Sequence, residues 1–392
     1  MTATIGGFRI RDPEGQCLEM DFGSLDEDSG IELAEWLKKN DTLTELSMTE
    51  NYLGVEVAKA LADALLVNKT LQKLDLFLNI FEAEGARALA RPLSKNCSLT
   101  DLSLEGNSLG DKGAKAVARG LVGNSTLLRL NLSANSHTEP LGDAGAEALA
   151  GALLNNRFLR RLDLSKNVIQ AQGGRALSFM LKENTTLRRL ELQDNELGDK
   201  GVKPICEVLK KRNRSLLRLD IGRNNLTVSM GLLMATLLDE NPILRQLGMS
   251  GNQLGYEGVR PIARSLRERN CTLLVLELSF TELCDKCAHK LSKMLKANGR
   301  LQQLDVRENE KLTEQGVKEL TQALKRNYSI IQLDTDYISA DMYNAIEVFT
   351  ERNKKLLEEN IKAAKDAGAG AGAAAEAKEE KKEKPKEKPK KA

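Results

Sequence analysis

Leucines recur along most of the chain within one fixed arrangement of apolar and polar positions. The segment 99–114 reads Leu-Thr-Asp-Leu-Ser-Leu-Glu-Gly-Asn-Ser-Leu-Gly-Asp-Lys-Gly-Ala, and an alanine-rich stretch follows it. Its first leucine belongs to a series with steps of 28, 28, 28, 32, 28, 29, 28, 29, 28 and 29 residues: Leu43, Leu71, Leu99, Leu127, Leu159, Leu187, Leu216, Leu244, Leu273, Leu301 and Ile330. A period held this closely indicates a repeat architecture, in which each unit packs on its neighbours.

Each repeat combines two hydrophobic periods. The Leu-x-Leu portion alternates and predicts a short strand. The Gly-x-x-Gly-Ala portion continues with helical spacing, as in Ala114, Val117 and Leu121, and predicts a helix. Strands stack about 4.8 Å apart whereas helices need about 8–10 Å, so a stack of such units must curve. We predict an α/β horseshoe solenoid with parallel strands on the concave face and helices on the convex face.

Asparagine occupies one slot after each predicted strand, with Thr281 as the internal exception. The slot is filled by Asn51, Asn79, Asn107, Asn135, Asn167, Asn195, Asn224, Asn252 and Asn309. A buried side-chain amide offers donors and an acceptor, so stacked copies can satisfy backbone groups where the chain leaves each strand. We interpret these asparagines as structural.

The repeat pattern divides the chain into four parts. Residues 1–42 are predicted to form an N-terminal cap with one degenerate repeat, in which 8–10 add an edge strand that shields the sheet. The repeats, of 28 to 32 residues, span 43–340, and a capping helix is expected over 341–366. Residues 367–392 are expected to be a disordered Ala/Gly linker and Lys/Glu/Pro tail, because such a sequence cannot bury enough apolar surface to fold.

Charge and hydropathy limit the cellular locations and the kinds of partner that are expected. The net charge of +2 implies no long-range attraction to nucleic acid. The sequence contains no run of 18 apolar residues, so no transmembrane segment is predicted. The first residues lack the pattern of a signal peptide, so a cytoplasmic location is expected, with a nuclear, ciliary or cytoskeletal one as alternatives. The basic tail either aids solubility or attaches the chain to an acidic surface such as a tubulin tail.

Residues that could carry chemistry are scarce. Cys284 and Cys287 form a C-x-x-C pair near His289, but both cysteines occupy slots that hold glycine in segment 99–114, and no second ligand pair accompanies them. The chain has two histidines and none of the usual phosphate-loop, nucleophile-elbow or zinc-protease motifs. We therefore predict no enzymatic activity, no cofactor, no metal and no small-molecule substrate.

The repeat length and the full helix in each unit resemble the ribonuclease-inhibitor-like subfamily of leucine-rich-repeat proteins. That subfamily also includes Ran GTPase-activating protein and the repeat domains of NOD-like receptors. The resemblance covers about residues 18–340 and implies the horseshoe fold with another protein as partner. It also implies an alternative, which is activation of a small GTPase by positioning the GTPase's own machinery.

Two columns of charged residues are expected on the concave face. Their members are Arg129, Arg161, Arg189 and Arg218 in one column and Asp163, Glu191 and Asp220 in the next. Neighbouring strands can pair such side chains, which would give a self-satisfied lattice of small energetic value. The arginines could equally form a footprint for carboxylates or phosphates of a partner. Both interpretations stay open at this stage.

Apolar residues in variable slots of the same face are candidate contacts. Phe77 and Leu78 lie near the N-terminal end of the repeats, and Phe280 and Tyr337 lie nearer the C-terminal end. Exposed aromatic side chains are common anchors of protein interfaces. We predict a non-catalytic scaffold that binds another protein on the concave face and rim loops. Besides the GTPase activator, a cytoskeletal or axonemal component whose tail contacts microtubules is an alternative.

Overall fold

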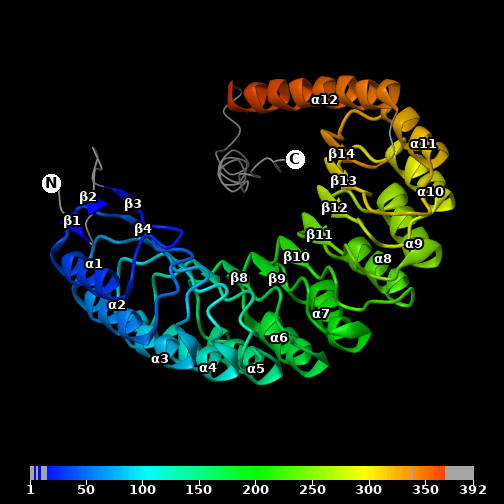
Figure 1. Ribbon diagram of the computed structural model, residues 1–392. Helices are drawn as coiled ribbons and strands as arrows, with labels where there is room; N and C mark the ends of the chain where they lie inside the picture. Colours follow the sequence, from blue (N-terminus) through cyan, green and yellow to red (C-terminus); the bar gives the residue numbers. More distant parts are fainter. Residues whose placement is uncertain (1–3, 6–7, 10–15, 337–338, 367–392) are drawn as a thin grey trace.

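The computed structural model describes residues 4–5, 8–9, 16–336 and 339–366. Short strands and helices alternate along the chain and form an open arc, with one parallel sheet on its inner side and the helices outside (Figure 1). Among the described residues the sheet has twelve strands in chain order, from β3 to β14. This arrangement confirms the predicted horseshoe.

The strands of this sheet each span three residues: β3 (Cys17–Glu19), β4 (Glu45–Ser47), β5 (Lys73–Asp75), β6 (Asp101–Ser103), β7 (Arg129–Asn131), β8 (Arg161–Asp163), β9 (Arg189–Glu191), β10 (Arg218–Asp220), β11 (Gln246–Gly248), β12 (Val275–Glu277), β13 (Gln303–Asp305) and β14 (Gln332–Asp334). The helices are α1 (Glu27–Lys39), α2 (Val55–Val67), α3 (Glu82–Leu93), α4 (Gly110–Gly123), α5 (Asp143–Leu153), α6 (Ala171–Glu183), α7 (Gly198–Lys211), α8 (Met230–Glu240), α9 (Gly255–Glu268), α10 (Asp285–Leu295), α11 (Glu314–Leu324) and α12 (Ala340–Asp366).

The leucine pattern determines which side of each strand faces the core. The middle residue of every strand from β3 to β14 is a buried leucine, and neighbouring copies such as Leu102 and Leu130 are register partners. The two flanking residues therefore point to the concave face. At the N-terminus, β1 (Thr4–Ile5) and β2 (Phe8–Arg9) pair with each other in a separate antiparallel sheet. The predicted edge strand beside β3 is therefore wrong.

The predicted asparagine ladder joins each repeat to the one before it. The side-chain amide of Asn79 donates to the carbonyl of Met48 at 2.9 Å, and its oxygen accepts from the N–H of Leu53 at 2.9 Å. Thr281, the exception in this slot, donates its hydroxyl to the carbonyl of Leu278 at 2.6 Å. Each side chain thus satisfies backbone groups that the bend after the strand would leave unpaired.

A second asparagine ladder runs along the other end of the repeats, where the helices finish. Asn96 donates to the carbonyl of Leu65 at 2.8 Å and accepts from the N–H of Leu99 at 2.7 Å. Its counterparts make the same kind of contacts: Asn68, Asn124, Asn156, Asn184, Asn213, Asn241, Asn270, Asn298 and Asn327. The leucine and asparagine patterns did not predict this second ladder.

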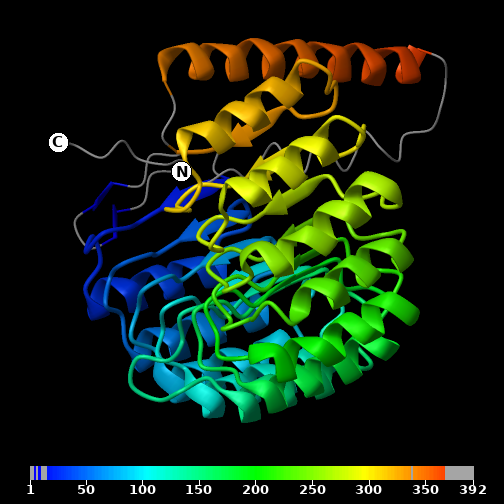
Figure 2. The ribbon, with the colours of Figure 1, turned by 90° about the vertical axis from the view of Figure 1, so that its right-hand side faces the viewer.

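Helix α12 lies across the C-terminal end of the solenoid (Figures 1 and 2). Asn353 is buried and extends the second ladder, because its amide donates to the carbonyl of Ile330 at 2.7 Å. The guanidinium of Arg352 lies 4.3 Å from the ring centre of Tyr328. Within the described part of the chain, no helix combines the length and the apolar character that a membrane span needs.

Candidate functional site

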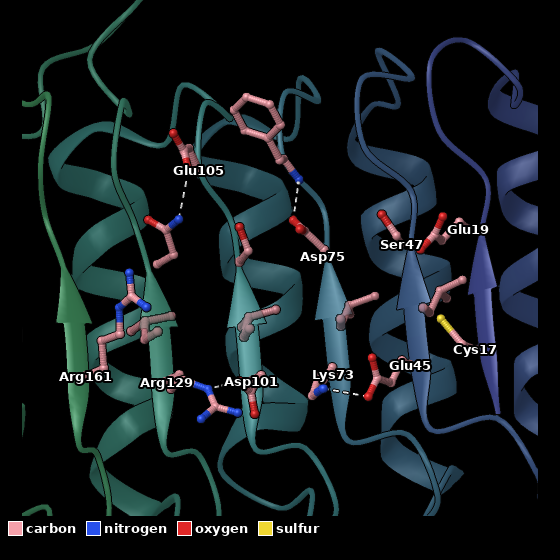
Figure 3. A pocket seen from close by; sticks show the side chains of 17 residues that line it. Cys17, Glu19, Glu45, Ser47, Lys73, Asp75, Asp101, Glu105, Arg129 and Arg161 are labelled. Carbon is pink, nitrogen blue, oxygen red and sulfur yellow. Dashed lines mark hydrogen bonds and ion pairs between the residues drawn. The ribbon is translucent and has the colours of Figure 1, made fainter. Parts of the chain in front are cut away.

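The concave face carries an open groove over β3 to β8, with a volume of about 830 Å³ (Figure 3). From β4 to β7 the first position of each strand carries a charged side chain, and the sign alternates: Glu45, Lys73, Asp101 and Arg129. Lys73 Nζ lies 2.5 Å from Glu45 Oε1, and Arg129 pairs with Asp101 on the preceding strand. The N-terminal half of the face is therefore polar, with its cations already matched by carboxylates on neighbouring strands.

The predicted charge columns meet on β8, β9 and β10, where they form what we name the central charge cluster: Arg161, Asp163, Arg189, Glu191, Arg218 and Asp220. Register pairs like with like, so Arg161 is opposite Arg189 and Asp163 is opposite Glu191. The shortest ion pairs of the cluster are consequently diagonal, between neighbouring strands. Glu191 bridges two arginines, at 2.9 Å from Arg161 Nη2 and 3.4 Å from Arg218 Nε.

Burial perturbs the carboxylates of this cluster. It raises the pKa of Asp163 to about 7, and the hydrogen bond and charge of Glu191 add to the effect. Burial also acts to raise the pKa of Glu191, but the hydrogen bond from Asp163 and the charges of Arg161 and Arg218 outweigh it, so this pKa is lowered. Burial raises the pKa of Asp220. A protonated Asp163 beside an ionised Glu191 thus leaves the two bridged arginines partnered.

The predicted apolar residues lie on loops that follow the strands. Leu78 and Phe280 occupy the same repeat position and are exposed, with φ of +52° and +53°. Phe77 is half-buried, and its N–H donates to Asp75 Oδ1 at 3.1 Å. Tyr337 lies outside the described residues. Leu78 and Phe280 come from distant repeats, so the structure does not bring them together (Figure 1).

Two exposed apolar residues beside Leu78 were missed in the sequence. Tyr52 and Ile80 follow Asn51 and Asn79 and are 76% and 51% exposed. The position after the slot asparagine is mostly polar in the other repeats, and this contrast could have revealed Tyr52 and Ile80 in the sequence. The other repeats have Ser108, Ser136, Val168, Glu196, Asn225, Gln253, Glu282 and Glu310 there. We name Tyr52, Phe77, Leu78 and Ile80 the apolar rim patch.

The cysteine pair begins α10. The sulfur atoms of Cys284 and Cys287 are 3.8 Å apart, and burial raises the pKa of Cys287 to about 12. A thiol held protonated at neutral pH is a poor nucleophile and a poor metal ligand. Within the residues that the structure describes, no group of three or more His, Cys, Asp or Glu side chains is placed to hold a metal ion.

Comparison with known proteins agrees with the architecture. A family model described as leucine rich repeat matches residues 67–90, 95–118, 155–178, 183–206 and 240–263. The chain is a leucine-rich-repeat protein. A chain from the crystal structure of the Rad7 and Elc1 complex in yeast superposes with a TM-score of 0.55 at 17% identity, over 82% of this chain and 75% of that one. At this identity the similarity shows the fold alone.

Curated relatives of this leucine-rich-repeat protein are much longer proteins. NACHT, LRR and PYD domains-containing protein 1a allele 1 of Rattus norvegicus is 35% identical over 116 residues, which are 29% of this chain and 9% of the relative. NACHT, LRR and PYD domains-containing protein 3 of Bos taurus is 31% identical over 155 residues, 39% of this chain and 15% of the relative. The matched part is a small share of each relative.

Proposed function

We propose that this leucine-rich-repeat chain is a non-catalytic interaction scaffold that binds another protein on its concave face and rim loops. One observation carries the proposal. The buried leucines and both asparagine ladders are nearly constant from repeat to repeat, whereas the two outward positions of each strand change in charge and size along the arc. Constant positions build the solenoid, and variable positions on a shared surface can encode recognition of a partner.

The contact residues we assign fall in three places on this face. The first is the groove side with Arg129, the second is the central charge cluster, and the third is the rim with Phe77, Leu78 and Phe280. Partly buried ion pairs fix side-chain positions before a partner arrives, which lowers the entropy lost on binding. The exposed apolar side chains would supply the anchors.

Site-specific photo-crosslinking tests the proposal directly. A photoreactive residue placed at Arg129 on the concave face should capture the same protein from native extract as one placed at Phe280 on the rim. A third, matched position is Val122 on α4, which is 69% exposed. Capture at Arg129 and Phe280, with competition by unlabelled chain and none at Val122, is the expected result. Capture of the same protein only at Val122 would contradict the concave face as the binding surface.

A further inference from the structure

The apolar rim patch is continuous across neighbouring loops. Backbone hydrogen bonds extend beyond the strands, from the N–H of Glu50 to the carbonyl of Phe77 at 2.8 Å and from the N–H of Leu78 to the carbonyl of Glu105 at 3.0 Å. The loops after β4, β5 and β6 therefore keep the register of the sheet. Side chains at equivalent positions, such as Tyr52 and Ile80, are neighbours on one rim.

The backbone beneath the patch is strained. Tyr52 and Leu78 have φ of +56° and +52°, a conformation that is disfavoured for bulky residues. Glu82 also has φ of +52°, at a repeat position where Gly110, Gly198 and Gly255 have positive φ. Large exposed side chains at these positions gain little burial in return for the strain. Positive φ recurs at the position of Leu78 in every repeat from Glu50 to Glu308, so the conformation belongs to the turn after each strand, and the patch is distinguished by the large apolar side chains placed there.

The neighbouring loop, after β6, contains a buried acceptor without a partner. Among the described residues, the side-chain oxygen of Asn107 is the buried side-chain atom with no hydrogen bond. In the preceding repeat the corresponding oxygen, on Asn79, accepts from the N–H of Leu53 at 2.9 Å. Because an unsatisfied buried polar group destabilises the fold, this repeat departs from the ladder at a cost in stability. Asn107 adjoins the loop that carries Phe77 and Leu78, because its side-chain amide donates to the carbonyl of Leu76 at 2.8 Å.

Carboxylates dominate the surroundings of the patch. Glu50, Asp75 and Glu105 lie on the same loops and strands, and Figure 3 shows Asp75 and Glu105 at the upper edge of the groove. The cations nearest in register, Lys73 and Arg129, already pair with Glu45 and Asp101. Burial raises the pKa of Asp75, and repulsion from Asp21 and Glu105 adds to it. A partner that brings positive charge would relieve this repulsion.

We propose that the apolar rim patch, with Glu50, Asp75 and Glu105 beside it, binds a cationic segment of a partner protein that also carries apolar side chains. The inference rests on the proposed function and names the chemistry of the partner. Apolar side chains would cover Tyr52 and Leu78, and lysine or arginine would reach the carboxylates. The chain's own basic tail, 378–391, contains only Lys, Glu and Pro, so it matches the charge but not the apolar patch.

The test uses phage-displayed random peptides of about 16 residues, selected on the full chain and then measured by fluorescence anisotropy. Peptides that combine Lys or Arg with Leu, Phe or Trp are expected. The double variant Tyr52→Asn/Leu78→Asn should weaken their binding by about tenfold or more, while the melting temperature stays unchanged or rises because Asn tolerates positive φ. The matched control is Leu232→Asn on α8, which is 68% exposed and should change neither.

A second pair of variants tests the charges. Asp75→Asn/Glu105→Gln should weaken binding of the selected peptides and reduce its dependence on salt, because two screened attractions are removed. Glu147→Gln, an exposed carboxylate on α5, is the matched control and should leave the salt dependence as it is.

Four outcomes would overturn the inference. These are selection of acidic peptides, no enrichment of any peptide, insensitivity of the peptides to the patch variants, and displacement of the peptides by synthetic 378–391, which would assign the patch to the chain's own tail. Peptides that lose binding with Arg161→Ala but not with the patch variants would overturn this inference and leave the proposed concave-face function standing. Peptides that respond only to Leu232→Asn would contradict both.

Discussion

The central charge cluster lies on strands of the concave face, whereas the apolar rim patch lies on the loops that follow the strands. The two regions differ in charge and in exposure. In the cluster, Glu191 is only 6% exposed and holds Arg161 and Arg218 by ion pairs within the sheet. In the patch, Tyr52 is 76% exposed on a strained backbone, and Ile80 is 51% exposed. The cluster is charged but internally satisfied, whereas the patch is apolar and open.

The comparison shows that a charged side chain on the concave face is not necessarily free to bind a partner. Charged columns in a repeat sequence suggest a footprint, yet neighbouring strands can neutralise them before any partner arrives. An exposed apolar side chain cannot be neutralised in this way by a neighbouring strand. We therefore expect substitutions in the cluster to lower stability as well as binding, and substitutions in the patch to act mainly on binding.

The largest expected effect on stability is in the cluster. Glu191→Ala removes the carboxylate that Arg161 and Arg218 share and should lower the free energy of unfolding by about 2 kcal/mol. The value is below that for fully buried pairs, because both arginines are partly exposed. Urea denaturation measures it. Glu257→Ala, which breaks an exposed pair with Arg260 at 3.0 Å, is the control and should change stability by less than about 0.5 kcal/mol.

An effect of known sign is expected from pH. The pKa of Asp163 is about 7 in the folded chain against an ordinary value of 3.8. Between these values the native state holds a proton that the unfolded chain has lost, so the contribution of Asp163 to stability falls as pH rises from about 4 to 7. Asp163→Asn should remove this fall and be more stable than the parent at pH 8. Parallel pH profiles for parent and variant would contradict the assignment.

The smallest stability effect is at the rim and has the opposite sign. Glu82→Gly places glycine at a positive-φ position, as in the repeats with Gly110 and Gly198, and should raise the free energy of unfolding by about 1 kcal/mol. Glu147→Gly, in the middle of α5, is the matched control and should lower it by about 1 kcal/mol. A destabilised Glu82→Gly variant would show that the loop after β5 is not strained.

The sequence predicted the repeat scaffold closely because both of its determinants are local and periodic. The leucine series specified which residue of each strand is buried, as at Leu102, and the asparagine slot specified the first ladder, as at Asn79. Asn96 and its counterparts recur with the same period. Their ladder was not predicted, because the pattern does not show that their amides reach carbonyls of the preceding repeat.

The candidate site was less predictable because it depends on pairing between strands and on backbone conformation. The charged columns left pairing and footprint equally open, and the diagonal contacts of Glu191 follow only from the register and side-chain geometry. The positive φ of Tyr52 and Glu82 is not indicated by these two residues themselves, since neither is glycine or asparagine, although glycine fills the position of Glu82 in other repeats, as at Gly110. Phe77 and Leu78 remain predicted contacts, whereas Tyr52 and Ile80 were recognised from their exposure.

Hydrogen–deuterium exchange of the full chain, with and without the protein captured by photo-crosslinking, tests the central claim most directly. The account predicts slower exchange of the loop amides of 49–53 and 77–82, and of the amides of β8, β9 and β10, when the partner is added. Slower exchange confined to the convex helices, with the rim loops and β8–β10 unchanged, would contradict it.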